Sequence, residues 1–228
     1  MIIAGMVKSS LVDFPGLVAG VLFVPGCNYD CFYCHNRSLL ENGPEPIDPE
    51  LVNAFLIKRS GFLDGIVITG GEPTLQPDLI PFIRSLKTLG YRVKLDTNGA
   101  KPQIIKEVLE SGLCDYFAVD YKAPSSRYAE ICGCNASGRA VLETIETLRR
   151  HHASFEVRTT VIPQLSQNDL LTMAKELPPL PRYVLNRYRP PEIYRGCDRT
   201  KIEEKPYTPS EIQGFALQMQ KDQPHIEG

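Results

Sequence analysis

Six short apolar segments alternate with longer amphipathic ones along the chain, and this alternation limits the folds that the sequence can adopt. The apolar segments have the length and composition of buried β-strands, and they span residues 17–26, 65–71, 91–99, 116–124, 155–163 and 182–188. Their apolar residues are consecutive rather than strictly alternating, which is typical of buried parallel strands. The sequence therefore predicts an α/β fold in which right-handed βαβ connections build a parallel sheet.

Helices are expected in the amphipathic segments between these strands. The first runs from about Pro49 to Arg59, because Asp48 is a suitable N-cap and proline is favoured in the first turn. The others are expected at residues 77–89, 101–112, 138–151 and 168–177, and residues 207–221 predict one additional helix packed on the outside.

The length, charge and cysteine content indicate the class of protein. The chain has 228 residues, and we expect one domain over residues 1–228, with a core at about 17–190 and a C-terminal tail and helix at about 191–228. Its 25 basic and 27 acidic residues nearly balance, which argues against bulk attraction to nucleic acid or to a membrane surface. No segment resembles a membrane span or a signal peptide, so we expect a cytoplasmic protein. Thiols stay reduced in that compartment, and the seven cysteines should therefore serve metal binding or redox chemistry rather than disulfides.

Polar residues and a pair of glycines, of the kind that bind ligands, lie within or directly after the predicted strands. Ligands bind at the carboxyl ends of parallel strands, so we expect these side chains to share one edge of the sheet. Beside a group of three cysteines after the first strand, they are Gly70, Gly71, Glu72, Asp96, Thr97, Asp120, Lys122, Arg158 and Arg189.

The three cysteines, Cys27, Cys31 and Cys34, lie within eight consecutive residues. Cys31 and Cys34 alone would suit half of a zinc site, completed by His35 or Cys197, or a redox-active dithiol. A dithiol would leave Cys27 without a role. The spacing of all three favours a [4Fe–4S] cluster with three protein ligands, in which one iron stays open for a substrate or cofactor.

The motif C-x-x-x-C-x-x-C, with Tyr33 at the aromatic position before the last cysteine, resembles the defining motif of the radical S-adenosylmethionine superfamily. This resemblance covers nearly the whole chain. It implies a partial (β/α)6 open TIM-like barrel that holds one [4Fe–4S] cluster and S-adenosylmethionine. The tetrapeptide "GGEP", residues 70–73, resembles the turn of this superfamily that binds the methionine end of the cofactor.

Further segments resemble the branch of this superfamily that activates glycyl radical enzymes. These are "CFYCHNR", "LDTNG" and "VDYKAP", while "KSSLVDFPG" and "DYKAPSSRYAEICG" are most similar to activators of the anaerobic ribonucleoside-triphosphate reductase. The resemblance implies reductive cleavage of S-adenosylmethionine and removal of a hydrogen atom from a glycine of that partner enzyme. It also implies a low-potential electron donor such as flavodoxin or ferredoxin.

The resemblance assigns expected roles to the polar residues. The cluster ligands would be Cys27, Cys31 and Cys34. Cofactor contacts would come from Tyr33, Gly70, Gly71, Glu72, Asp96, Thr97, Asp120, Lys122, Arg158 and Arg189. The two aspartates and the threonine would line a site for the cofactor and a monovalent cation, and the basic side chains would reach the carboxylate or ribose of the cofactor. No residue is expected to act as an acid–base catalyst.

Structural alternatives stand beside these assignments. Lys122 and Arg158 could instead be ion-pair partners of Asp96 and Asp120. His35 and Asn36 are expected to cap the segment that follows the cysteines rather than to bind metal. The remaining cysteines are expected to pack as small apolar side chains rather than to hold a second metal, namely Cys114, Cys132, Cys134 and Cys197.

Two other functions remain open from the sequence. The same core could act on a small molecule or on a partner of the pyruvate formate-lyase type. The chain could also be a non-enzymatic metal-binding or redox module, which would bind zinc rather than assemble an iron–sulfur cluster.

Overall fold

The computed structural model describes residues 1–40, 45–133 and 135–228. Its strands are β1 (Gly5–Ser10), β2 (Ala19–Val24), β3 (Gly65–Gly70), β4 (Arg92–Thr97), β5 (Tyr116–Asp120), β6 (Phe155–Val161), β7 (Tyr183–Arg187) and β8 (Ile226–Glu227). Its α-helices are α1 (Pro49–Arg59), α2 (Leu79–Thr88), α3 (Pro102–Glu110), α4 (Tyr128–Cys132), α5 (Gly138–Arg150), α6 (Gln167–Glu176), α7 (Arg199–Ile202) and α8 (Pro209–Met219).

The expected α/β fold is confirmed. The strands follow one another in the order β1-β2-β3-β4-β5-β6-β7-β8 in the sheet, and β2 to β7 are the six strands predicted from the apolar segments. Pairing is parallel between β2 and β3, with Val21 opposite Val67, and between β6 and β7, with Thr159 opposite Leu185.

Two strands were not predicted. Strand β1 pairs antiparallel with β2, and its side chains are half-buried or exposed, so it lacks the apolar run that marks a buried strand. Strand β8 is two residues long and pairs parallel with β7, which is too short for any sequence pattern. The six predicted helices are α1, α2, α3, α5, α6 and α8, whereas the short helices α4 and α7 were missed.

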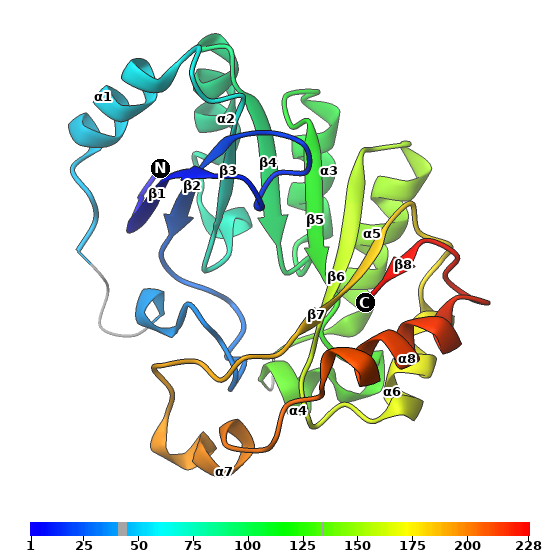
Figure 1. Ribbon diagram of the computed structural model, residues 1–228. Helices are drawn as coiled ribbons and strands as arrows, with labels where there is room; N and C mark the ends of the chain where they lie inside the picture. The colour runs from blue at the N-terminus through cyan, green and yellow to red at the C-terminus, as the bar shows by residue number, and fades with distance from the viewer. Residues whose placement is uncertain (41–44, 134) are drawn as a thin grey trace. The chain divides into compact units, whose positions relative to one another are not determined.

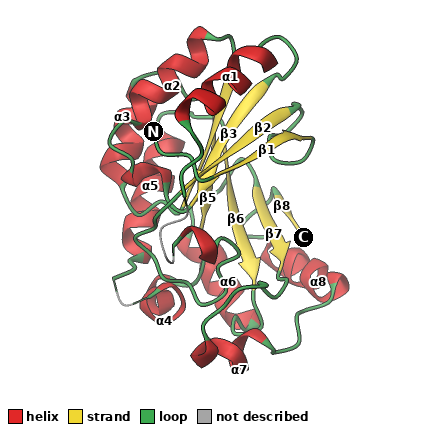
Figure 2. Cartoon of the chain, turned by 90° about the vertical axis from the view of Figure 1, so that its left-hand side faces the viewer, coloured by secondary structure: helices red, strands yellow, loops and turns green. Residues whose placement is uncertain are grey.

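The chain divides into two compact units, each described by itself. Unit 1 comprises Met1–Cys27, Ser38–Thr97 and Gln103–Ala118, and unit 2 comprises Asn28–Arg37, Asn98–Pro102 and Val119–Gly228. In unit 1, Leu22 and Ile68 in the strands and Ile83 in α2 are fully buried, which gives this unit its own hydrophobic core. Figure 2 shows α2 and α3 together on one side of the strands.

Helix ends in both units follow the local signals in the sequence. Asp48 caps α1 as predicted, because its carboxylate accepts a hydrogen bond from the main-chain N of Glu50 at 2.8 Å. In unit 2, α6 begins with a capping box of Ser166 and Asp169, and α8 packs against α6 (Figure 1). None of the helices among the described residues is long and apolar enough to cross a membrane.

Candidate active site

The cysteine-rich loop begins directly after β2. In unit 1, Gly26 has a φ of +79° and its N–H donates to the carbonyl of Leu39 at 3.0 Å, so the chain turns just before the half-buried Cys27. In unit 2, Cys31 is buried and Cys34 is half-buried, and the N–H of Cys34 donates to the carbonyl of Cys31 at 3.2 Å. All three cysteines are free thiols, so no disulfide competes with their use as ligands.

Cys132 contacts the loop from the end of α4, which sequence reasoning did not anticipate. It is fully buried, in line with the expected apolar packing, but its side chain also hydrogen-bonds Cys31. This hydrogen bond lowers the pKa of the Cys31 thiol below its ordinary value. Burial acts to raise that pKa, but the positive charge of Lys122 also lowers it, and the lowering effects prevail. Burial raises the pKa of the Cys34 thiol.

Tyr33 lies in the apolar interior of unit 2, between the second and third cysteine. Its ring makes edge contacts with Phe32, at 5.2 Å between ring centroids, and with Tyr188, at 6.4 Å. Its hydroxyl is buried, and none of the described residues offers it a hydrogen bond. A buried phenol of this kind suits a site that takes up an additional polar group.

The turn after β3 packs closely against the start of the cysteine loop in unit 1. The main-chain N of Glu72 donates to the carbonyl of Gly26 at 2.8 Å, and the N of Gly71 donates to the carbonyl of Val24 at 2.8 Å. A Cβ on Gly71 would lie 1.9 Å from the Gly26 oxygen, and Gly70 has a φ of +114°. Both positions therefore require glycine.

Glu72 carries a fully buried carboxylate in unit 1. Its Oε1 accepts hydrogen bonds from the main-chain N of Thr74 at 3.0 Å, from Thr74 Oγ1 at 2.6 Å and from Thr97 Oγ1 at 2.8 Å. The structure thus brings Glu72 and Thr97 together, and Thr97 holds the carboxylate from the end of β4.

Asp96 pairs with Lys94, which sequence reasoning missed. The two side chains are 3.0 Å apart, and the Lys94 ammonium also donates to the carbonyl of Asp13 at 2.6 Å. Lys94 is only 2% exposed although it lies in the middle of β4. A lysine inside an otherwise apolar strand was the available signal, because buried ammonium groups need partners.

Asp120, Lys122 and Arg158 form one ionic group in unit 2. Lys122 Nζ lies 3.0 Å from Asp120 Oδ2, and Arg158 Nε lies 3.0 Å from Asp120 Oδ1. Burial acts to raise the pKa of the Asp120 carboxyl, but the two cations outweigh it and lower that pKa to about 2. The pKa of Lys122 is raised well above its ordinary value, because the attraction of Asp120, helped by Tyr33 and Cys31, outweighs burial.

Arg189 follows β7 and is exposed. No ion pair to its guanidinium is present in the part of the chain that the structure describes, so it does not join the ionic group around Asp120. Its backbone hydrogen-bonds the side chain of His35, whose pKa is lowered, chiefly by burial.

The remaining cysteines are dispersed. The Cys114 sulfur lies 3.3 Å from the carbonyl oxygen of Tyr116, and Cys197 is exposed. Cys134 lies outside the described residues. Within the described ranges, no three His, Cys, Asp or Glu side chains are gathered closely enough to hold a single metal ion.

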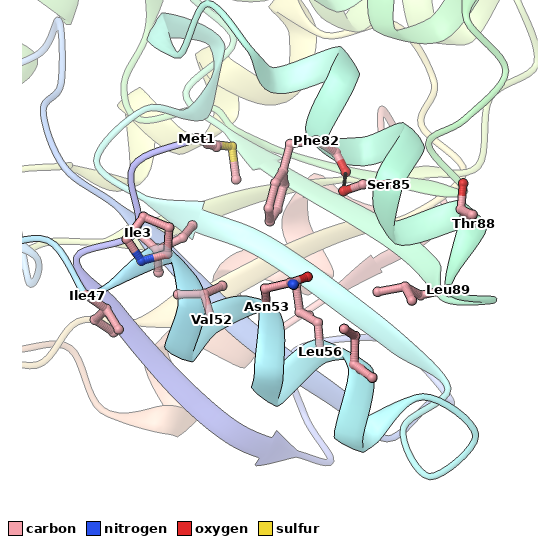
Figure 3. A pocket seen from close by; sticks show the side chains of 12 residues that line it. Met1, Ile3, Ile47, Val52, Asn53, Leu56, Phe82, Ser85, Thr88 and Leu89 are labelled. Carbon is pink, nitrogen blue, oxygen red and sulfur yellow. Dashed lines mark hydrogen bonds between the residues drawn. The ribbon is translucent and has the colours of Figure 1, made fainter.

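A large apolar cavity of about 510 Å³ lies in unit 1, beside α1 and α2 (Figure 3). Its wall includes Met1, Val52, Leu56 and Phe82, and none of the predicted site residues contributes to it. A smaller cavity of about 440 Å³ in unit 2 borders the cysteine loop at Asn28, which accepts a hydrogen bond from the side chain of Asn98 at 2.9 Å.

Comparison with known proteins identifies relatives of this chain. The family model of the Radical SAM superfamily matches residues 21–177. A protein of Methanocaldococcus jannaschii, whose name assigns it provisionally to the glycyl-radical enzyme activating enzymes, is 35% identical over 202 residues, or 85% of this chain and 82% of that protein.

Two solved structures share the fold. Streptococcus suis SuiB bound to S-adenosylmethionine has a TM-score of 0.67 at 14% identity, covering 91% of this chain and 52% of SuiB. A domain of a pyruvate-formate lyase-activating enzyme from Bacteroides vulgatus has a TM-score of 0.54 at 22% identity, covering 72% of this chain and 99% of that domain.

Proposed function

Because the chain belongs to the radical SAM superfamily, we propose that it is an enzyme that activates a glycyl radical enzyme, and that this partner is the anaerobic ribonucleoside-triphosphate reductase. Membership of the superfamily implies a [4Fe–4S] cluster and S-adenosylmethionine. When bound, the cluster would supply one electron that splits S-adenosylmethionine into methionine and a 5′-deoxyadenosyl radical, and this radical would take a hydrogen atom from a glycine Cα of the partner. A low-potential donor such as flavodoxin or ferredoxin would replace that electron.

The donor set fits the cluster. Cys27, Cys31 and Cys34 are free thiols in one short loop, and three thiolates are what a cluster with one open iron requires. A cluster distributes its ligands over separate iron atoms, so it does not need them gathered around one point as a single zinc ion does.

The main support for the proposal is the main-chain contact of Gly71 and Glu72 with Gly26. It holds the glycine turn against the residue before Cys27 at main-chain distance, in the same unit. A turn that positions backbone groups beside a cluster ligand suits the methionine end of a cofactor that must also reach the open iron. The main chain at Gly70 and Gly71 would receive its amino group on carbonyl oxygens, and Glu72 would neutralise the ammonium.

Each unit also carries charged side chains of the kind that a zwitterionic sulfonium ligand requires. Lys122 and Arg158 would bind the cofactor carboxylate, and Arg189, which is exposed, would reach it or the ribose from the segment after β7. Asp96 and Thr97 of unit 1 and Asp120 of unit 2 would supply oxygen ligands to the cofactor or to a monovalent cation. Tyr33 would offer its buried hydroxyl to the cofactor.

The decisive experiment mixes the reduced, cluster-loaded protein with S-adenosylmethionine and the anaerobic reductase of the same cell. We expect 5′-deoxyadenosine together with a glycyl radical signal on the reductase, and much less radical on a partner of the pyruvate formate-lyase type. The Cys31→Ala variant is the matched control and should give neither product. Cofactor cleavage that modifies a small metabolite and leaves every glycyl radical enzyme unchanged would contradict the proposal.

A further inference from the structure

Lys94 places an ammonium group inside unit 1, next to a residue of the proposed cofactor site. Its side chain is 2% exposed, and its neighbours in β4, Val93 and Leu95, are fully buried. Side chains two residues apart in a strand point to the same face, so Lys94 and Asp96 lie together on one face of β4. Lys94 Nζ is 3.0 Å from Asp96 Oδ1. The charge of Lys94 therefore acts on Asp96 from within the core.

The other side of the ammonium is fixed by the segment after β1. Lys94 Nζ donates to the carbonyl oxygen of Asp13 at 2.6 Å. The main-chain N of Asp13 donates to the hydroxyl of Ser10 at 3.3 Å. The next residue, Phe14, is 2% exposed and packs with Val21 in the hydrophobic core of unit 1. The carbonyl that accepts from Lys94 is thus held by the core, which fixes the position of Nζ.

The contacts of the Lys94 ammonium are those of a bound cation. It lies against one carboxylate oxygen, from Asp96, and one main-chain carbonyl oxygen, from Asp13. Such oxygens are the ligands that hard metal cations prefer in proteins. The side chain of Asp96 is only 11% exposed, and a charge that is largely removed from water is costly without a partner of opposite charge. Lys94 provides that partner within the chain, so no ion has to be taken from solution.

We propose that Lys94 is a positioning residue for Asp96, and that its ammonium supplies the positive charge that a monovalent cation would otherwise bring to this carboxylate. This inference rests on the proposed function, because that function assigns Asp96 to the cofactor site. The unmodified chain should then bind S-adenosylmethionine equally well in potassium and in a cation too large to enter the protein. Removal of the ammonium should create a site that potassium can fill.

One variant of the full chain and one matched control test this proposal. Lys94→Met removes the ammonium and keeps an apolar stem of similar length. Lys87→Met is the control, because it removes an ammonium that lies 2.7 Å from another aspartate of unit 1, Asp115. Each chain is measured in potassium chloride and in tetramethylammonium chloride at the same ionic strength. The readouts are the unfolding free energy of the cluster-free chain and the dissociation constant of S-adenosylmethionine for the cluster-loaded chain.

We expect the dissociation constant of Lys94→Met to rise about ten- to a hundredfold in tetramethylammonium, the range that one interaction with a charged group provides, and to recover in potassium. Potassium should also stabilise the cluster-free Lys94→Met chain, since an ion that binds only the folded state raises the unfolding free energy. The unmodified chain and Lys87→Met should respond equally to both salts. A lysine with a merely structural role would not be replaced by an ion.

Equal responses of Lys94→Met and the unmodified chain to potassium would overturn this inference and leave the proposed function standing. A gain in stability or affinity of the unmodified chain that is specific to potassium would also overturn it, and this measurement does not depend on the folding of any variant. Asp96→Asn introduced into Lys94→Met should abolish the stabilisation by potassium, because the carboxylate ligand is then absent.

Failure of the proposed function would give a different result. A cluster-loaded unmodified chain that binds no S-adenosylmethionine would refute that function. The unfolding measurements use cluster-free chains and no cofactor, so they would still decide whether the Lys94 ammonium replaces an ion at Asp96.

Discussion

At the scale of single residues, the turn after β3 is built from main-chain contacts that leave no room for a side chain. A Cβ atom added to Gly71 would lie only 1.9 Å from the carbonyl oxygen of Gly26. By contrast, Gly214 in α8 has open space around the same position. The two positions therefore carry the same residue but differ in whether they can accommodate a methyl group.

Gly71→Ala should destabilise the protein by about 3 kcal/mol or more, because the backbone of the turn must separate from Gly26. Gly214→Ala should stabilise it by about 0.5–1 kcal/mol, because alanine is the better helix former. Urea unfolding of the cluster-free chains measures both changes. Equal stabilities of the two variants would show that the turn can open without cost.

The ionic group around Asp120 gives a prediction about cofactor affinity. Lys122→Ala or Arg158→Ala should weaken binding of S-adenosylmethionine by about 1.5–3 kcal/mol each, the contribution of one hydrogen bond to a charged group. Titration calorimetry on the cluster-loaded protein measures it. Arg182→Ala is the matched control, because Arg182 pairs with Glu156 and Glu227 in the same unit. Unchanged affinity in the first two variants would limit Lys122 and Arg158 to structural pairing with Asp120.

At the scale of elements, the cysteine loop has no regular secondary structure of its own. Between Cys27 and Cys34 its conformation depends on contacts from outside the loop, such as the bond from Asp30 to the carbonyl of Cys132. Sequence spacing therefore identified the loop, whereas its neighbours determine how it is held.

Replacement of Cys27, Cys31 or Cys34 by alanine should abolish cluster assembly, since a cluster with one open iron has no spare protein ligand. Visible absorption and iron content after anaerobic reconstitution measure this. The exposed Cys197 supplies the control, and Cys197→Ala should load iron normally. Cys132→Ala should also keep its cluster, because Cys132 contacts Cys31 without being needed as a ligand. Iron loss in Cys132→Ala together with iron retention in Cys31→Ala would reverse the assignment.

At the scale of the whole molecule, the lowered pKa of Asp120 makes stability depend on pH. The folded carboxyl has a pKa of about 2, whereas an unfolded aspartate has one near 3.9. The charged form is therefore favoured by folding, and its contribution is fully present above about pH 4 and declines as the pH falls toward 2.

The ionised Asp120 carboxyl should contribute about 2 kcal/mol to the free energy of unfolding, because its pKa is lower in the folded than in the unfolded chain. Comparison of the cluster-free protein with Asp120→Asn isolates it, because the difference in unfolding free energy should shrink as the pH is lowered from 5 to 2.5. A difference that stays constant over this range would show that the pKa of Asp120 is close to its unfolded value.

Local patterns in the sequence determined most of the elements and the identity of the motifs. Strand and helix positions depend on hydrophobic periodicity and on caps such as Asp48, which act within a few residues, and the spacing of Cys27, Cys31 and Cys34 is itself local information. The positions of these strands and helices were predicted correctly, whereas the role of the three cysteines as cluster ligands remains a prediction.

Only the tertiary structure decided which polar groups meet. Both Lys122 and Arg158 pair with Asp120, whereas Asp96 pairs with Lys94, and no sequence pattern distinguished these possibilities. The contacts of Arg37 and Cys132 with Cys31, and the pairing of β1 and β8, were also absent from the sequence interpretation. Such contacts depend on packing between segments distant in the chain, so the choice among several acids and bases is made by geometry that local propensity does not encode.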